Sequence, residues 1–385
     1  DTMVNQIKRG IVDMIGAARP SIADPFLPKK IEEGRYEDIR ECIGCNICYT
    51  GDQLGVPIRC TQNPTMGEEW RRGWHPEYVP EKKSESSVLV IGAGPAGLEA
   101  AHALGKRGYK VILSEARNEL GGRVAQESRL PSLSEWIRVK DYREQQFLKL
   151  PNVEVYLDSH LSAEDALLTE VDHIVIATGA KWRADGFGRN NAICIENLGA
   201  SEQIFTPDDI MVGRLPKGRV IVFDDDYYYM GPVIAEMLQK GGCQVTFVST
   251  SNMACSFGSY TSEQPSAQKA LINAGVQMIF SQNIQAYDGE NIELSCMYTE
   301  RASMLKADAI VMVTARLPID ELYYQLQDLI ENGKAGSTQS IRRIGDCEAP
   351  ALIASAVYAG RKYALELDDS SGTNYLVRRD VNFSS

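Results

Sequence analysis

The chain has 385 residues, 44% of them hydrophobic, which is enough for two or three globular domains that can bury a cofactor. Its formal net charge of −12 makes nucleic acid an unfavourable partner, because phosphate backbones are bound by clustered Lys and Arg. No apolar run approaches the roughly 20 residues that span a bilayer, and the odd set of nine cysteines does not suit a disulfide framework. We therefore expect a cytoplasmic protein with metal-bound thiols and no membrane partner.

Residues 1–40 predict a helix, a buried strand and a second helix, in that order. The strand is expected over residues 11–18, which read IVDMIGAA. This stretch is too short to bury a core of its own, so we interpret it as the end of a domain. Because the chain begins with Asp1 rather than Met, we expect either a processed protein or a piece of a longer one.

The segment 41–80 carries the strongest signal in the sequence and predicts irregular loops organised around a metal. An iron–sulfur cube needs four soft thiolates, and two closely spaced turns supply three of them. Gly44 permits the tight backbone path that aims amides at the sulfurs. The alternatives are a zinc site, which usually pairs two distant CxxC knuckles or recruits His, and unligated buried thiols. The predicted ligands of one [4Fe–4S] cluster are Cys42, Cys45, Cys48 and Cys60.

After a polar linker at 81–87, short apolar runs alternate with helical segments, which predicts parallel sheets covered on both faces. A second, degenerate unit of the same kind restarts near Val220. The polar tail after Asp368 is expected to lie on the surface. The strands are expected at 88–94, 111–115, 173–179, 220–224, 245–249, 276–280 and 309–314.

A nucleotide-binding fingerprint, GxGxxG, closes the strand at 88–94 and opens a helix. Gly92 makes the turn, Gly94 lets the backbone approach a pyrophosphate, and Gly97 allows close packing of helix on strand. Glu115 ends the next strand, where a carboxylate can bind ribose hydroxyls. The alternative is a glycine-rich turn with no ligand. The predicted adenine-nucleotide site consists of Gly92, Ala93, Gly94, Pro95, Ala96, Gly97 and Glu115, with Gly122, Arg123 and Gly179 in two later glycine motifs.

The second unit departs from this pattern, because its strand at 220–224 runs into DDDYYYMG with no GxGxxG. The carboxylates of residues 224–226 would repel a pyrophosphate, and the bulky side chains of 227–229 replace glycines. We therefore predict that this unit does not bind NAD(P)H. A metal site built from the Asp run is the alternative.

Four segments together resemble the trimethylamine, dimethylamine and histamine dehydrogenase family, whose relatives include the dienoyl-CoA reductases. They are IGAARPSIADP, CIGCNIC, RCTQNPTMGEEWRRGWHPE and VIGAGPAGLEAA, and the resemblance extends over about residues 1–367. It implies an α/β chain made of the end of a TIM barrel, an irregular [4Fe–4S] segment and two Rossmann-like modules of the glutathione-reductase type. The implied domains are an FMN-barrel remnant at 1–40, the [4Fe–4S] segment at 41–86, an ADP- or FAD-binding domain at 87–213 plus 326–385, and a degenerate NAD-like domain at 214–325.

The resemblance also implies an activity and its participants. Family members oxidise a small amine with FMN held in the barrel, most of which this sequence lacks together with the catalytic residues. Electrons then pass through the cluster to electron-transferring flavoprotein, and family members are homodimers. Arg19 is expected to hold the FMN phosphate, and Asp346 matches the motif that reaches the ribityl and pyrophosphate region in FAD-containing relatives. The competing hypotheses are an NAD(P)H-dependent enoate or dienoyl-CoA reductase and a non-catalytic electron-carrier subunit or inactive fragment.

Overall fold

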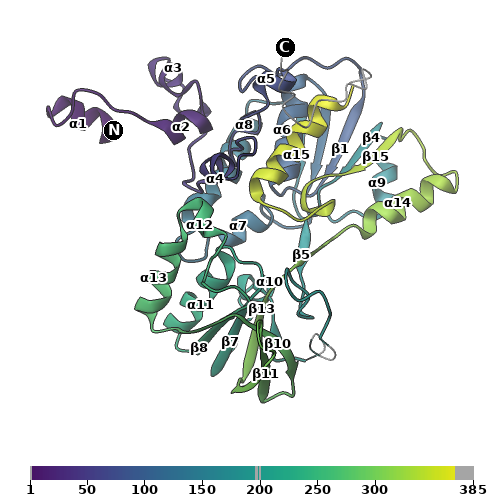
Figure 1. Ribbon diagram of the computed structural model, residues 1–385. Coiled ribbons are helices and arrows are strands. Elements are labelled where there is room, and N and C mark those ends of the chain that lie inside the picture. Colours follow the sequence, from purple (N-terminus) through teal and green to yellow (C-terminus); the bar gives the residue numbers. More distant parts are fainter. Residues whose placement is uncertain (1, 196–197, 199–200, 369–385) are drawn as a thin grey trace, which may run out of the picture.

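The computed structural model describes residues 2–195, 198 and 201–368, and the tail expected after Asp368 lies outside this range. Figure 1 shows two α/β lobes, one above the other, with the N-terminal helices set to one side. The first lobe comprises residues 87–182 and 316–368, and the second lobe comprises residues 183–315, apart from the undescribed positions. No helix among the described residues is long and apolar enough to cross a membrane.

The first lobe is built on a five-stranded parallel sheet of order β15-β4-β1-β2-β3. Apolar residues fill both sides of its central strands, which is typical of a parallel sheet between two helical layers. Its strands are β1 (Ser87–Ile91), β2 (Lys110–Ser114), β3 (Val153–Tyr156), β4 (His173–Ile176) and β15 (Ser340–Arg343). Helices α6 (Pro95–Arg107) and α15 (Ile353–Glu366) cover one face, and α9 (Ala163–Leu168) and α14 (Glu321–Glu331) cover the other.

The second lobe repeats this plan with a parallel sheet of order β6-β13-β7-β8-β9. One face is covered by helices, and the other by a three-stranded antiparallel sheet. Its parallel strands are β6 (Ile204–Phe205), β7 (Arg219–Asp224), β8 (Gln244–Ser249), β9 (Gln277–Phe280) and β13 (Ala309–Val313). The helices are α10 (Pro207–Met211), α11 (Met230–Lys240), α12 (Gly258–Thr261) and α13 (Gln264–Ala274), and the antiparallel strands are β10 (Gln282–Tyr287), β11 (Asn291–Cys296) and β12 (Ala302–Lys306).

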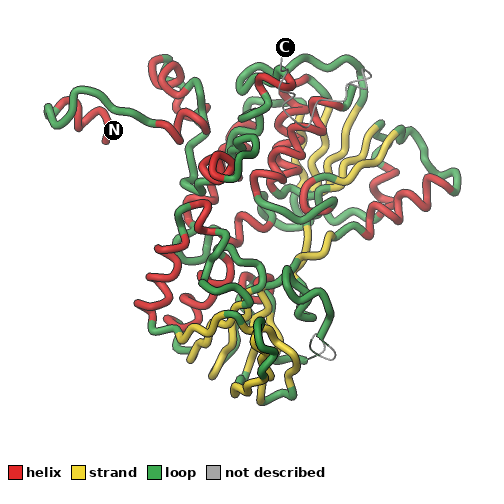
Figure 2. The backbone as a smooth tube through the Cα atoms, viewed as in Figure 1, coloured by secondary structure: helices red, strands yellow, loops and turns green. Residues whose placement is uncertain are grey.

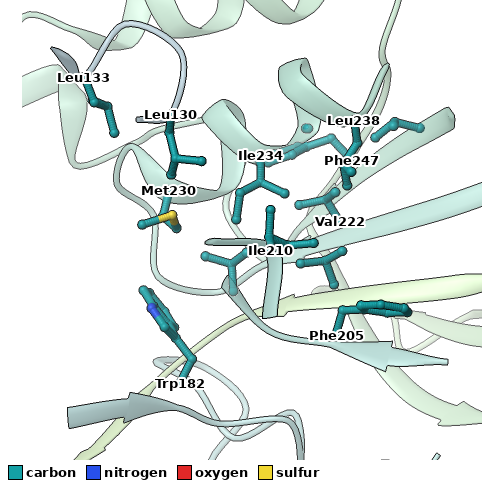
Figure 3. Close-up of a cluster of buried hydrophobic side chains, with 14 of the residues drawn as sticks. Leu130, Leu133, Trp182, Phe205, Ile210, Val222, Met230, Ile234, Leu238 and Phe247 are labelled. Carbon is teal, nitrogen blue, oxygen red and sulfur yellow. The ribbon is translucent and has the colours of Figure 1, made fainter. Parts of the chain in front are cut away.

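The two lobes are joined by an antiparallel strand pair and by a shared core. Strand β5 (Ala180–Trp182) pairs with β14 (Arg316–Pro318), so the chain crosses between the lobes twice at one place. Figure 3 shows Leu130 and Leu133, from the first lobe, beside Met230 at the start of α11. Because β6 pairs with β13, the second lobe begins ahead of the boundary expected after residue 213, and α14 belongs entirely to the first lobe.

The residues ahead of β1 form short helices and loops without strands, as Figure 2 shows. The strand expected over residues 11–18 is therefore wrong. Ile11 is 57% exposed and Met14 85%, and this segment has no neighbouring strand to complete its hydrogen bonds. The helices are α1 (Thr2–Lys8), α2 (Ala18–Ala23), α3 (Leu27–Glu32), α4 (Ile47–Gln53) and α5 (Glu69–Arg72), and the first lobe adds α7 (Arg123–Glu127) and α8 (Arg138–Phe147).

Candidate functional site

The turn between β1 and α6 has the geometry that the glycine fingerprint predicts. A Cβ on Gly92, where φ is +100°, would lie 2.5 Å from the carbonyl oxygen of Ala177. A Cβ on Gly97 would lie 1.9 Å from the carbonyl oxygen of Gly92. A Cβ on Gly94 would meet no atom within 4 Å, so this glycine leaves the backbone open to a ligand. The first amides of α6 have no partners within the helix, which suits an anion at this position.

Glu115, just beyond β2, is held rigidly beside this turn. Its carboxylate accepts hydrogen bonds from the amides of Ala93 at 2.8 Å and Arg117 at 2.9 Å, and the residue is only 7% exposed. It also lines the cavity described next. Glu115 therefore fixes the turn and faces the cavity, and its contact with ribose hydroxyls stays a prediction.

A cavity of about 1100 Å³ runs from the glycine turn to the cysteine segment and the second lobe. The two fingerprint residues that do not line it, Ala93 and Gly97, are both buried. Its volume is slightly above the range of about 300–1,000 Å³ that is typical of pockets for small molecules and cofactors. The expected nucleotide residues on its wall are Gly92, Gly94, Pro95, Ala96, Glu115, Gly122, Arg123, Gly179 and Asp346.

The two later glycine motifs close the cavity from the other side. Gly122, with φ +55°, packs so tightly that a Cβ would lie 3.0 Å from Cα of Gly94. The Arg123 guanidinium donates to the carbonyl of Ala180, and Asp346 forms an ion pair with Arg316. The expected Arg123 and Asp346 are thus brought to one wall, each already engaged with the strand pair that links the lobes.

The carboxylates of the second unit hold the loops around them. Asp225 accepts hydrogen bonds from the Asn190 amide at 2.9 Å and the Thr250 hydroxyl at 2.6 Å. Asp224 accepts the Tyr227 amide at 3.1 Å, and its complete burial raises its pKa well above the usual range. No group of three or more His, Cys, Asp or Glu in the described chain is placed to bind a single metal ion. The structure therefore gives no support to a metal site in the Asp run.

Tyr228 and Tyr229 form an aromatic wall between the cavity and the cysteine segment. Their ring centroids lie 4.8 Å apart, and Tyr229 lies 4.5 Å from Trp136. The Tyr229 hydroxyl donates to Glu127 at 2.8 Å, which ties the wall to α7. The sequence predicted bulky residues here but not their contact with Trp136 and Glu127, which are remote in the chain.

The four expected ligand cysteines gather in one segment at the edge of this cavity, and all are free thiols. Burial raises the pKa of Cys45, and the neighbouring Cys42 and Cys48 raise it further. Burial raises the pKa of Cys60 to about 12, with Cys45 and Cys48 adding to the effect. Each of the four sulfurs therefore lies within electrostatic reach of at least two of the others.

The backbone turns tightly within the cysteine segment, as the prediction from Gly44 requires. Gly44 and Asn46 both have left-handed φ values, +74° and +53°, and α4 begins immediately afterwards. The amides of Gln62 and Asn63 lower the pKa of Cys60 and so point toward its sulfur. No group of three or more His, Cys, Asp or Glu among the described residues, these cysteines included, is placed to hold a single metal ion.

Arg19 lies against the cysteine segment rather than in the cavity. Its guanidinium donates to the side-chain carbonyl of Asn46, and its charge lowers the pKa of Cys48, which burial raises overall. The side chain is exposed. The structure thus brings the arginine expected to hold an FMN phosphate close to the expected cluster ligands.

Comparison with known proteins supports both lobes. A family model described as "NAD(P)-binding Rossmann-like domain" matches residues 90–158, and one described as "OYE-like second alpha/beta domain" matches residues 205–309. The chain is 37% identical to dimethylamine dehydrogenase of Hyphomicrobium sp. (strain x) over 96% of this chain and 54% of that protein.

Two solved structures are also similar. Histamine dehydrogenase from Rhizobium sp. 4-9 is 47% identical, with a TM-score of 0.95, over 99% of this chain and 59% of that one. The 6-hydroxypseudooxynicotine amine oxidase from Pseudomonas geniculata N1 is 48% identical, with a TM-score of 0.91, over 97% and 55%. The chain spans about half the length of the curated relatives it matches.

The fold and the site place the chain among the flavoprotein oxidoreductases with a Rossmann-like domain. Within that class, it belongs to the family of trimethylamine, dimethylamine and histamine dehydrogenases.

Proposed function

We propose that this chain is the electron-transfer portion of an iron–sulfur amine dehydrogenase that acts on CH–NH donors. The observation that carries the proposal is the gathering of four free cysteines beside the cavity that the glycine turn opens, with Cys45 on its wall. When bound, a [4Fe–4S] cluster supplies one-electron transfer, which splits a two-electron oxidation into two single steps.

In this proposal, residues of the chain hold the cluster and shield it from water. Cys42, Cys45, Cys48 and Cys60 supply the four thiolates. The amides of Gln62 and Asn63 stabilise negative charge on Cys60, and the Thr61 hydroxyl lies 3.1 Å from the Cys45 sulfur. Hydrogen bonds to cluster sulfurs and exclusion of water are the means by which a protein sets a cluster's reduction potential.

The first lobe, on this proposal, binds an adenine nucleotide, either ADP or FAD. Gly94 exposes backbone to the pyrophosphate, Glu115 stands at the ribose, and Gly122 and Gly179 line the same cavity. The tight contacts of Gly97 keep α6 close to β1, so its first amides are aimed before a ligand arrives.

The remaining participants follow from the family. The amine and FMN would bind in the part of the relatives that this chain does not span, with Arg19 contributing to the FMN phosphate site. The proposed electron acceptor is electron-transferring flavoprotein, the proposed assembly is a homodimer, and the proposed location is the cytoplasm. An amine dehydrogenase is favoured over an NAD(P)H-dependent reductase because Tyr228 and Tyr229 occupy the wall beside α11.

Metal analysis of anaerobically prepared protein tests the proposal. We expect about four irons per chain and an EPR signal on reduction, as one [4Fe–4S] cluster requires. Replacing Cys60 by Ser should reduce the iron content sharply. Replacing Cys243, a half-buried thiol of the second lobe, by Ser should leave the iron content unchanged. Stoichiometric zinc without iron in the unaltered protein would contradict the cluster.

A further inference from the structure

Gln62 lies two residues after Cys60 and holds two cysteine-bearing stretches of backbone together. The residue is only 1% exposed, and its side-chain amide donates to the carbonyl oxygens of Glu41 and Arg138, both at 3.1 Å. Glu41 directly precedes Cys42. One carboxamide therefore joins the loop that begins at Cys42 to the loop that contains Cys60.

The same carboxamide is connected to the nucleotide helix through buried charges. Arg143 on α8 donates to the side-chain oxygen of Gln62 at 3.1 Å and to its main-chain oxygen at 3.3 Å. Arg143 also donates to Glu99 on α6 at 2.8 Å, and Arg361 on α15 contacts the other Glu99 oxygen at 2.8 Å. The side chains of all three charged residues are at most 2% exposed. Separating the partners of a buried ion pair leaves a charge that neither water nor a counter-ion compensates. The contacts of Glu99 with the two arginines therefore resist rearrangement.

We propose that the Gln62–Arg143–Glu99 relay couples the nucleotide site to the cysteine site, with Gln62 as a positioning residue. The inference rests on the proposed function, because it requires both a cluster and a nucleotide. An anion at the first turn of α6, where Gly94 lies, fixes the helix that carries Glu99. Because Glu99 holds Arg143 and Arg143 holds Gln62, fixing the helix also fixes the side chain of Gln62. The position of Gln62 in turn sets the spacing between the Cys42 and Cys60 loops. By linkage, a cluster on the cysteines strengthens nucleotide binding by the same factor.

Anaerobic calorimetry with ADP measures this coupling. The wild-type chain reconstituted with iron and sulfide should bind ADP about fivefold or more tightly than the iron-free chain, which is the lower end of typical coupling between two sites. The Gln62→Leu variant should show equal affinities in the two states. The matched control is Gln146→Leu, because Gln146 is a buried glutamine of α8, the helix that carries Arg143, and its side chain donates to Glu37 and Asp38 and not to Gln62. This variant should keep the wild-type ratio.

Two further measurements can contradict the inference. The EPR spectrum of the reduced cluster should change on ADP addition in wild type and in Gln146→Leu, but not in Gln62→Leu. Arg143→Lys keeps a charge near Glu99 but replaces three separate guanidinium nitrogens, which contact Glu99 and both oxygens of Gln62, with a single ammonium nitrogen. This variant should also lose the coupling, and it tests the relay independently if the Gln62 variant fails to fold. Wild-type protein that takes up no iron would contradict both the proposed cluster and this inference. Iron-loaded protein that binds ADP no more tightly than the iron-free chain would overturn the coupling alone, as would a ratio that persists in the variants.

Discussion

Gly94 and Gly97 stand three residues apart in one motif but differ in what a side chain would meet. A Cβ at residue 97 would lie 1.9 Å from a backbone oxygen, whereas a Cβ at residue 94 would enter open space on the cavity wall. One glycine therefore serves packing and the other serves ligand approach, although the sequence pattern treats them alike.

We expect Gly97→Ala to destabilise the chain by about 1–3 kcal/mol, the usual cost of overpacking a fixed backbone. Gly94→Ala should leave the unfolding free energy almost unchanged and weaken ADP binding by about tenfold, because the methyl group stands where the pyrophosphate approaches. Denaturant unfolding and calorimetry on both variants measure the two effects. Equal stabilities for the two variants would contradict the packing role of Gly97.

His102, on α6, predicts a pH dependence of stability. Complete burial lowers its pKa from 6.5 to about 4, against the opposing pull of Glu99. The unfolded chain takes up a proton below pH 6.5 that the folded chain resists, so stability is fully present above pH 6.5 and is lost as pH falls toward 4. Between pH 7.5 and pH 5 the loss should be on the order of 2 kcal/mol.

The His102→Gln variant should lose most of that dependence, as measured by denaturant unfolding at the two pH values. The exposed His160 supplies the control, because His160→Gln should keep the wild-type dependence. A slope that persists unchanged in His102→Gln would assign the effect to other groups.

At the scale of elements, the turn between β7 and α11 decides whether the second lobe can receive a dinucleotide. Its backbone passes through a left-handed residue, Tyr227 with φ +71°, and then places Tyr228 and Tyr229 on the cavity wall. Gly231, the first glycine after the strand, is packed against the Asp224 side chain, where a Cβ would lie 2.8 Å from its Cγ. No glycine is left at this turn to give a pyrophosphate access to the backbone.

Titration with NADH and NADPH should therefore show neither binding nor reduction of the reconstituted chain. The reason is local, since carboxylates and tyrosine rings stand where phosphate and nicotinamide would lie. Absorbance of the cluster under anaerobic conditions follows the titration, and dithionite reduction of the same sample is the positive control. Rapid bleaching by NADH would favour the reductase hypothesis.

Every strand expected from 88 onward is present, because each is a short apolar run that pairs within a parallel sheet, and the central strands are buried on both faces. The antiparallel strands β10 to β12 were not predicted. They are half-polar, as in QNIQAY and ASMLK. Contact with the second sheet buries Ile284, Ile292 and Leu294 of β10 and β11, whereas β12 stays largely exposed. The strand expected over 11–18 shows the converse, since an apolar run without neighbours stays outside any sheet.

The candidate site likewise combines residues that the sequence predicts with contacts that it does not. The glycines and Glu115 could be predicted because each acts through its own backbone position within one β–α–β unit. By contrast, Tyr229 contacts Glu127, which is 102 residues away in the sequence, and Gln62 contacts Arg143, which is 81 residues away. No local pattern encodes such pairs, so only the fold reveals them.

For the whole molecule, the two lobes and the cysteine segment enclose one cavity, while α1 and α2 extend to one side of it (Figure 1). The side chains of Met3, Val4 and Ile7 on α1 are each 45–50% exposed. The chain spans 54% of the length of dimethylamine dehydrogenase and 59% of the histamine dehydrogenase chain. Under the proposed function, the amine would be oxidised in the part of these relatives that this chain does not span.

We expect the chain by itself, loaded with iron and ADP, to oxidise neither dimethylamine nor histamine with an artificial electron acceptor. Activity should appear when the chain is fused behind the N-terminal portion of a dehydrogenase relative and supplied with FMN, because that portion would bring the amine site next to Arg19 and Cys48. In the fusion, Arg19→Ala should lower the retained FMN, whereas Arg9→Ala, which removes an exposed arginine of the same N-terminal segment, should not. Amine oxidation by the isolated chain would show that a catalytic site exists within these 385 residues. It would contradict the proposal that the amine is oxidised in a part of the relatives that this chain does not span.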